Sequence, residues 1–213
     1  LAEKAAQINR AGAEISRRAA AGRACVFGSI GPSGVMLMMG QTSEAELRQA
    51  FDEQAQALAD GGADAIVVET MADPAEAELA VAAARATRLP VVASMTFDSG
   101  KDRDRTMMGT TPEEVAERLT KAGAEVIGSN CGQGIEGYVA IGKRLKAATD
   151  RPIWIKANAG LPEVVDGQTV WKQTAEEFAS YIPALVEAGA SFLGGCCGTT
   201  PVFIRAIKEK LNG

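Results

Sequence analysis

The sequence predicts an α/β protein built on a parallel sheet, because three features recur along its 213 residues. Charged, alanine-rich stretches with a helical pattern alternate with short β-branched runs. Glycine ends a helix and a strand follows at once in GGAD (61–64), AGAE (122–125) and AGAS (188–191). The strand runs lack a period of two, as expected of strands buried on both faces. Such alternation places helices against a parallel sheet.

The predicted elements are six strands that alternate with helices after one leading helix. The strands cover residues 24–30, 63–69, 89–97, 125–130, 152–158 and 191–195. The helices cover residues 1–23, 43–60, 74–88, 112–122, 135–149, 175–188 and 201–211.

Local signals mark where several of these helices begin. Ser43 is an N-cap, and Glu46, three residues later, completes a capping box. Asp73 and Thr111 are N-caps that precede a proline at the first helical position. The longest irregular stretch, residues 98–110, follows a strand and is either a solvated loop or a lid.

Two architectures fit this order of elements: an open doubly wound sheet and a (β/α)8 barrel. A barrel usually needs about 250 residues and eight strand–helix units. The chain supplies six strands and begins with a helix. A barrel would therefore lack its first strand, first helix and second strand.

Composition excludes several classes of protein. The net charge is 22 − 27 = −5, and no basic run indicates binding to nucleic acid. No apolar stretch approaches the roughly 20 residues of a membrane helix, and the N-terminus has no signal-peptide core. Four cysteines are too few for a disulfide scaffold, so we expect a cytoplasmic protein. Histidine is absent, which excludes histidine catalysis and histidine metal sites.

Three of the four cysteines lie where strands end, which is where α/β proteins place active sites. Cys131 ends one predicted strand, and Cys196 and Cys197 follow the last. Three thiolates that converge there can bind Zn²⁺ and leave a fourth position open. A strained disulfide between neighbours, or three inert buried thiols, are the alternatives. Cys25 begins a strand, and we expect it in the core.

An all-thiolate zinc site favours one kind of chemistry. Three thiolates donate so much charge that the metal activates water weakly, but it can still bind a substrate thiol and remove its proton. The bound sulfur stays electron-rich and can attack an alkyl group. The cysteine pattern therefore indicates S-alkylation without a histidine base.

Three segments resemble the signature segments of the homocysteine S-methyltransferase family: GSNCG (128–132), KANAGLP (156–162) and GGCCGTTP (194–201). GSIGPSG (28–34) and VVETM (67–71) resemble two further strand ends of that family. The resemblance covers residues 1–213 as one homocysteine-binding domain. It implies a (β/α)8 barrel, zinc on Cys131, Cys196 and Cys197, and attack of a zinc-bound homocysteine thiolate on a methyl group to give methionine.

The resemblance also implies roles for residues around the zinc site. Glu69 matches the acidic residue that holds the substrate amino group. Asn158 matches an asparagine that fills the fourth zinc position before substrate enters, although it could equally be a turn residue. Ser29 and Gly31 lie in the turn expected near the substrate carboxylate, where backbone N–H groups can bind an anion.

The sequence departs from the family at its start. The family's first strand carries an Asp-Gly segment and its second an Asn-Thr segment, and neither is present. We therefore expect the barrel to lack its first β–α–β portion, which leaves two strand edges exposed.

Two other functions stay open. The chain could bind zinc without catalysis, or the glycines 194, 195 and 198 could form a phosphate-ester site before the last helix. Family members take their methyl group from methylcobalamin, betaine or sulfonium compounds. The version GSNCGQG (128–134) slightly favours a corrinoid carried on a separate protein.

Overall fold

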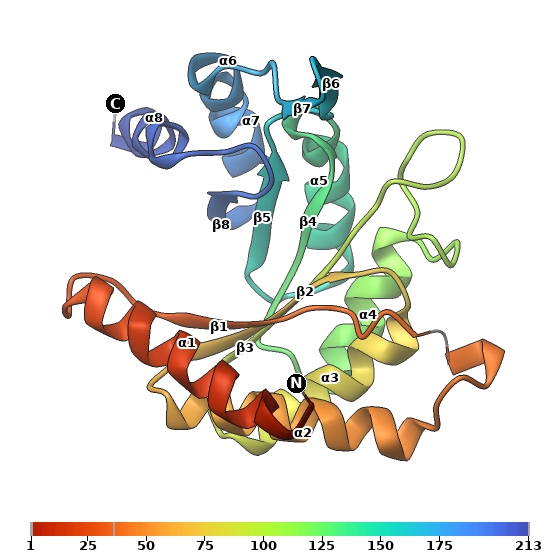
Figure 1. Ribbon diagram of the computed structural model, residues 1–213. Coiled ribbons are helices and arrows are strands. Elements are labelled where there is room, and N and C mark those ends of the chain that lie inside the picture. The colour runs from red at the N-terminus through yellow and green to blue at the C-terminus, as the bar shows by residue number, and fades with distance from the viewer. Residues whose placement is uncertain (1, 36, 213) are drawn as a thin grey trace.

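The computed structural model describes residues 2–35 and 37–212, and its centre is a six-stranded parallel sheet (Figure 1). The strand order is β1-β2-β3-β4-β5-β8, and every neighbouring pair is parallel. The strands are β1 (Phe27–Ile30), β2 (Ala65–Met71), β3 (Val91–Met95), β4 (Val126–Gly134), β5 (Ile153–Asn158) and β8 (Ala190–Gly195). The predicted α/β class and the six parallel strands are confirmed.

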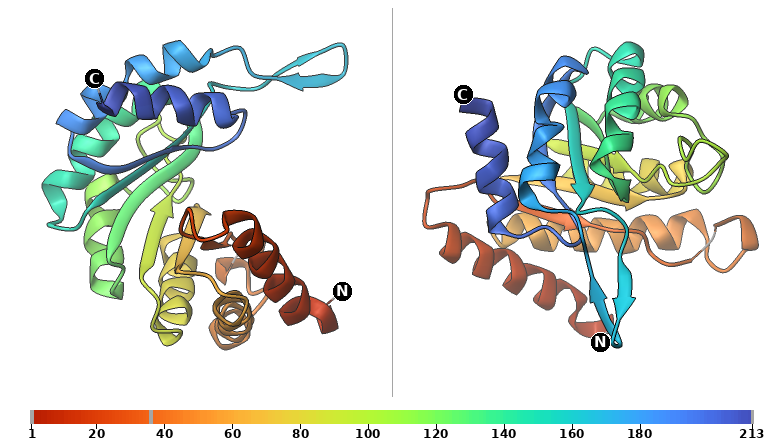
Figure 2. Two further views of the ribbon diagram at one scale, coloured as in Figure 1. Left: turned by 90° about the vertical axis from the view of Figure 1, so that its left-hand side faces the viewer. Right: turned by 90° about the horizontal axis from the view of Figure 1, so that it is seen from above.

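Helices lie along the outer face of the curved sheet (Figure 2). They are α1 (Ala5–Ala20), α2 (Glu44–Asp60), α3 (Pro74–Ala86), α4 (Pro112–Ala122), α5 (Tyr138–Ala148), α6 (Ala175–Ser180), α7 (Ile182–Glu187) and α8 (Pro201–Asn212). Short 3-10 turns cover Ala2–Lys4, Leu37–Met39 and Ile135–Gly137. Leu1, the first residue of the predicted leading helix, lies outside the described residues. No helix in the described part of the chain is long and apolar enough to cross a membrane.

The predicted caps form as expected. Ser43 and Glu46 make a reciprocal capping box, the Asp73 side chain accepts from the Ala75 N–H, and Thr111 makes a second box. These bonds satisfy helix N–H groups that have no partner within the helix. The caps fix where α2, α3 and α4 begin, and hence where the loops that follow β1, β2 and β3 end.

The hydrophobic core lies between the sheet and the helices. Side chains on the outer face of the strands are fully buried there, among them Ile66, Val68, Ile127 and Ile155. Each such side chain contributes about 1.5–3 kcal/mol relative to an exposed one. Because this core on the outer face already stabilises the fold, the inner face of the sheet can carry polar groups.

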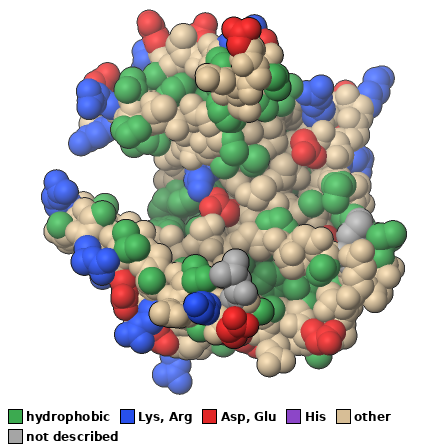
Figure 3. Space-filling view, in the orientation of Figure 1, with side chains coloured by type: hydrophobic (Ala, Val, Ile, Leu, Met, Phe, Trp, Pro, Cys, Tyr) green, Lys and Arg blue, Asp and Glu red, His purple; other side chains and the backbone are tan. Residues whose placement is uncertain are grey.

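The sheet is open between β1 and β8, which are its two edge strands. Figure 3 shows the surface hollowed between the part that carries β1 with α1 and the part that carries β8 with α8. Three rings bridge part of this gap from β1, β5 and β8. The ring centroids of Phe27 and Trp154 are 5.6 Å apart, as are those of Trp154 and Phe192.

Three details differ from the sequence prediction. Cys25 is exposed rather than in the core, because β1 starts only at Phe27 and is an edge strand. The predicted helix over 175–188 is divided at Tyr181, because Pro183 has no N–H for a helical hydrogen bond. An antiparallel hairpin of β6 (Glu163–Val165) and β7 (Gln168–Val170) was not predicted.

Candidate metal centre

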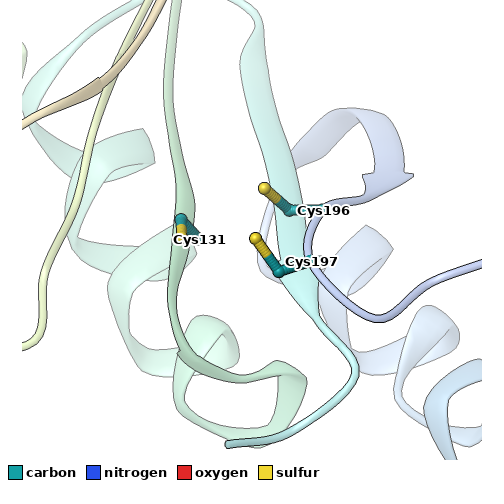
Figure 4. Close-up of side chains that lie close together, drawn as sticks. All are labelled: Cys131, Cys196 and Cys197. Atoms are coloured by element: carbon teal, nitrogen blue, oxygen red, sulfur yellow. The ribbon is translucent and has the colours of Figure 1, made fainter. Parts of the chain in front are cut away.

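Three cysteines converge at the C-terminal ends of two strands: Cys131 lies in the last part of β4, and Cys196 and Cys197 follow β8 (Figure 4). The Sγ atoms of Cys131, Cys196 and Cys197 all lie within 4.8 Å of one another. All four cysteines of the chain are free thiols in the structure. A zinc–sulfur bond of about 2.3 Å in tetrahedral geometry places two sulfurs about 3.8 Å apart. The sulfur positions and the soft donor atoms therefore fit a zinc ion.

A local break in β4 aims Cys131 at the other two cysteines. Its φ is 62°, and the register against β5 shifts between Cys131 and Gly134. Such a bulge redirects a side chain, and a left-handed conformation costs a non-glycine residue about 1–2 kcal/mol. The hydroxyl of the fully buried Tyr138 donates to the Cys131 carbonyl at 2.6 Å. Tyr138 thus stabilises the strained conformation from below.

Backbone contacts with β5 fix the Cys196–Cys197 pair. The Cys196 N–H donates to the Ala157 carbonyl at 2.7 Å, and the Ala159 N–H donates to the Cys197 carbonyl at 2.9 Å. The chain then turns at Gly198, whose φ is 79°. A Cβ atom there would lie 2.2 Å from the Trp171 ring, so only glycine fits.

Asn158 connects the two halves of the cysteine cluster. Its Oδ1 accepts from the Cys197 N–H at 3.0 Å, and its Nδ2 donates to the Gly132 carbonyl at 3.1 Å. Nδ2 also lies 3.7 Å from the Cys131 sulfur. The side chain is only 4% exposed. Its oxygen, which the resemblance assigns to the fourth zinc position, is hydrogen-bonded to Cys197 here.

Asn130 performs a similar task beneath the cluster, and sequence reasoning did not single it out. Its Oδ1 accepts from the Ser94 hydroxyl at 2.7 Å and from the Thr70 N–H at 2.8 Å. Its Nδ2 donates to the Thr70 hydroxyl at 2.8 Å and lies 3.9 Å from the Cys196 sulfur. Thr70 also has a left-handed φ of 64°. In the sequence, the only signal for this role was that Asn130 directly precedes Cys131.

The thiols are electrostatically coupled. Hydrogen bonds from the Cys196 thiol and, with a smaller effect, from the Asn158 amide lower the pKa of Cys131 to about 7. Burial and the nearby Cys197 act in the opposite direction. The pKa of Cys196 is raised above its ordinary value because it is the donor and is partly buried. Metal binding must therefore release protons from the cluster.

A second polar group occupies the inner face of the sheet. Glu69 on β2 accepts from the Ser29 hydroxyl of β1 at 2.8 Å, and it pairs with the Lys156 ammonium of β5 at 2.6 Å. The structure thus brings the predicted residues Glu69 and Ser29 together. Lys156 was missed, although it begins the KANAGLP segment. Gly31 lies in the exposed turn after β1, and an added Cβ there would meet no heavy atom within 4 Å.

The loop over residues 98–110 forms a wall beside the cysteines. A cavity of about 470 Å³ is lined by its residues Asp98, Ser99 and Met107 together with Thr70, Thr96 and Cys131. Backbone bonds between Ser99 and Arg105 close the loop on itself. Arg144 on α5 bonds to Asp104 in the loop and to Glu113 on α4. The loop is therefore fastened to the helices.

The chain is similar to several known proteins. A sequence profile described as "Homocysteine S-methyltransferase" matches residues 1–211. The methionine synthase of Mycobacterium tuberculosis is 31% identical over 220 residues, which are 97% of this chain and 18% of that protein. Betaine–homocysteine S-methyltransferase 1 of Danio rerio is 31% identical over 225 residues, which are 97% of this chain and 54% of that protein.

Solved structures show the same fold. The apo form of the homocysteine methyltransferase MmuM from Escherichia coli has a TM-score of 0.79 at 24% identity, covering 99% of this chain and 74% of that one. Its metallated form has a TM-score of 0.77 at 25% identity, covering 96% and 70%. The chain thus spans only part of these relatives' length. The match of the family profile over nearly the whole chain shows that this protein belongs to the homocysteine S-methyltransferase family.

Proposed function

We propose that residues 1–213 form one homocysteine-binding domain that transfers a methyl group to the sulfur of homocysteine and so produces methionine. The observation that carries this proposal is the cluster of three cysteine sulfurs within 4.8 Å of one another, in a chain of this family. A thiol-rich site without histidine suits chemistry on sulfur better than hydrolysis.

We propose zinc as the metal and Cys131, Cys196 and Cys197 as its ligands. When bound, zinc supplies the positive charge that keeps a substrate sulfur deprotonated at neutral pH. Asn158 orients Cys131 and Cys197 through its three contacts, and Tyr138 holds the Cys131 backbone. Groups of this kind that contact the ligands commonly change metal affinity 10- to 100-fold when removed.

The reaction requires a deprotonated homocysteine sulfur, an in-line methyl group and little water. The substrate thiol loses its proton to solvent, its sulfur forms a bond to the methyl carbon, and the bond from that carbon to the donor breaks. In this proposal Glu69 accepts hydrogen bonds from the substrate ammonium through one carboxylate oxygen, while the Ser29 hydroxyl donates to the other. In this proposal the donor's methyl group reaches the substrate sulfur through the cavity beside Cys131.

The methyl donor in this proposal is a corrinoid on a separate protein, which the GSNCGQG version of the cysteine segment favours. Betaine and sulfonium compounds are the competing donors, and the name of the Danio rerio relative includes betaine. Zinc-loaded protein should convert homocysteine to methionine with a methylated corrinoid protein and not with betaine. Methionine formed from betaine alone would overturn the choice of donor.

The same assay tests the function itself, with methionine measured by mass spectrometry for all three donor classes. The Cys196→Ser variant is the control and should produce no methionine. Protein that binds zinc but forms no methionine with any donor would support the non-catalytic alternative. The phosphate-ester alternative is disfavoured because an added Cβ at Gly194, Gly195 or Gly198 would lie within 3.0 Å of Lys156, Thr199 or Trp171, so packing accounts for these glycines.

A further inference from the structure

We propose that Lys156 binds the carboxylate of the amino-acid substrate while Glu69 binds its ammonium group, so that the ion pair opens to receive a zwitterionic head group. This inference rests on the proposed function, because it assumes that the substrate sulfur lies at the cysteine cluster. It adds a residue that determines specificity for α-amino acids over simple thiols.

The pair spans the inner side of the sheet rather than linking neighbouring strands. Lys156 is on β5 and Glu69 is on β2, with β3 and β4 between them in the sheet order. The Nζ–Oε2 distance is 2.6 Å, and the side chains are 23% and 14% exposed. Two opposite charges that are largely desolvated but still reachable match a ligand that carries one charge of each sign.

The pair also lies at a suitable depth below the cysteines. Lys156 precedes Asn158 by two residues, and its register partner Gly194 precedes Cys196 by two. Two residues along a strand span about 7 Å, and they point to the same face. Homocysteine has two methylene groups between its sulfur and its α-carbon. A substrate with its sulfur at the cluster therefore reaches the Glu69–Lys156 layer with its head group.

Gly194 makes room for the lysine to cross. A Cβ atom at Gly194 would lie 3.0 Å from Cγ of Lys156, closer than side chains normally approach. The lysine stem therefore occupies the space that a side chain on β8 would fill. The long stem also lets the ammonium move aside when a ligand inserts between it and Glu69.

The groups near the cysteine cluster are negatively charged, so a substrate carboxylate needs a cation in order to bind there. Three thiolates around a bound Zn²⁺ would leave a net charge of −1, and Glu69 adds a further carboxylate. A substrate carboxylate brought near these groups would be repelled without a positive partner. Lys156 is the cationic group that the structure places against Glu69. The competing possibility is that Lys156 only blocks Glu69 and must be displaced by the substrate.

Three thiols separate these possibilities: homocysteine, 3-aminopropane-1-thiol, which lacks the carboxylate, and 4-mercaptobutyric acid, which lacks the amino group. Binding to cobalt-substituted protein is followed by the sulfur-to-cobalt absorption change. Lys156→Met should weaken homocysteine and 4-mercaptobutyric acid binding about tenfold or more. It should not weaken binding of 3-aminopropane-1-thiol, whose ammonium no longer competes with the lysine for Glu69. Glu69→Gln should weaken homocysteine and 3-aminopropane-1-thiol instead, and Lys156→Arg should restore part of the homocysteine affinity.

Lys172→Met is the matched control, because Lys172 also pairs with a glutamate, Glu163, but is 67% exposed. It should leave all three affinities unchanged. Tighter homocysteine binding by Lys156→Met would show that the lysine blocks Glu69, and equal weakening of all three thiols would show a structural role; either result overturns the proposal. If the wild-type protein changes its cobalt spectrum with none of the thiols, the proposed function itself fails.

Discussion

Replacing Tyr138 with phenylalanine tests how the fold holds the first metal ligand in place. The substitution removes one hydroxyl and keeps the ring, which is fully buried. That hydroxyl donates to the Cys131 carbonyl at 2.6 Å. No other change in packing is expected, because the two side chains have nearly the same shape.

The expected magnitude follows from the acceptor that is left behind. A buried carbonyl without its partner costs about 1–3 kcal/mol. Cys131 also has a left-handed φ of 62°, so its backbone is biased to relax when this bond is lost. We expect the free energy of unfolding of the metal-free protein to fall by about 1–3 kcal/mol. Zinc affinity should fall about tenfold or more, since Cys131 would no longer be held in position.

Two measurements check this expectation: urea unfolding of the metal-free protein, and zinc affinity from competition with a chromophoric chelator. Tyr181→Phe is the matched control, because it removes the only other tyrosine hydroxyl of the chain, and Tyr181 is partly exposed. The control should have wild-type zinc affinity. Wild-type stability and zinc affinity in Tyr138→Phe would refute the role of this hydrogen bond.

Three further predictions follow from the cluster and its surroundings. Cys196→Ser should lose zinc, because a neutral hydroxyl replaces a thiolate, while the exposed Cys25→Ala should keep one zinc by metal analysis; the opposite pattern would show a wrong ligand set. Alkylation of Cys131 by iodoacetamide in metal-free protein should have its midpoint near pH 7, because the thiolate reacts and its pKa is lowered to about 7; a midpoint near 9 would contradict the coupling to Cys196. Arg144 lowers the pKa of Glu113 from 4.5 to about 2, so this pair stabilises the folded state above pH 4.5 and the effect is lost as the pH falls through 2. Arg144→Met should therefore cost at most about 1 kcal/mol at pH 7, because the pair is partly exposed, and should match the wild type near pH 2 in unfolding experiments.

Local chemistry explains why most of the fold could be predicted from the sequence. Ser43, Asp73 and Thr111 act on helix N–H groups within three residues, so their effect does not depend on the rest of the chain. The β6–β7 hairpin was not predicted, although the sequence carries a local signal for it as well. Asp166 and Gly167 lie between two β-branched runs, and both have the positive φ that a tight hairpin turn requires.

The contacts that build the site were harder to predict from the sequence. Glu69 and Lys156 are 87 residues apart, and only the curvature of the sheet brings them together. Tyr138 on α5 holds the bulge at Cys131, and Asn130 on β4 holds the irregularity at Thr70 on β2, so each depends on a residue from another element. Cys25 was misplaced because its exposure depends on β1 being an edge strand, a tertiary property. Residue types at strand ends predicted the cysteine cluster, whereas the groups that orient it required the structure.

The most direct test of the proposed metal centre is the zinc content of purified, freshly reduced protein, measured before and after alkylation of its thiols. The three converging cysteines predict one zinc per chain, lost when the thiols are alkylated. Reduced protein that binds no zinc when zinc is supplied, or that keeps its zinc after complete alkylation, would contradict a centre formed by Cys131, Cys196 and Cys197.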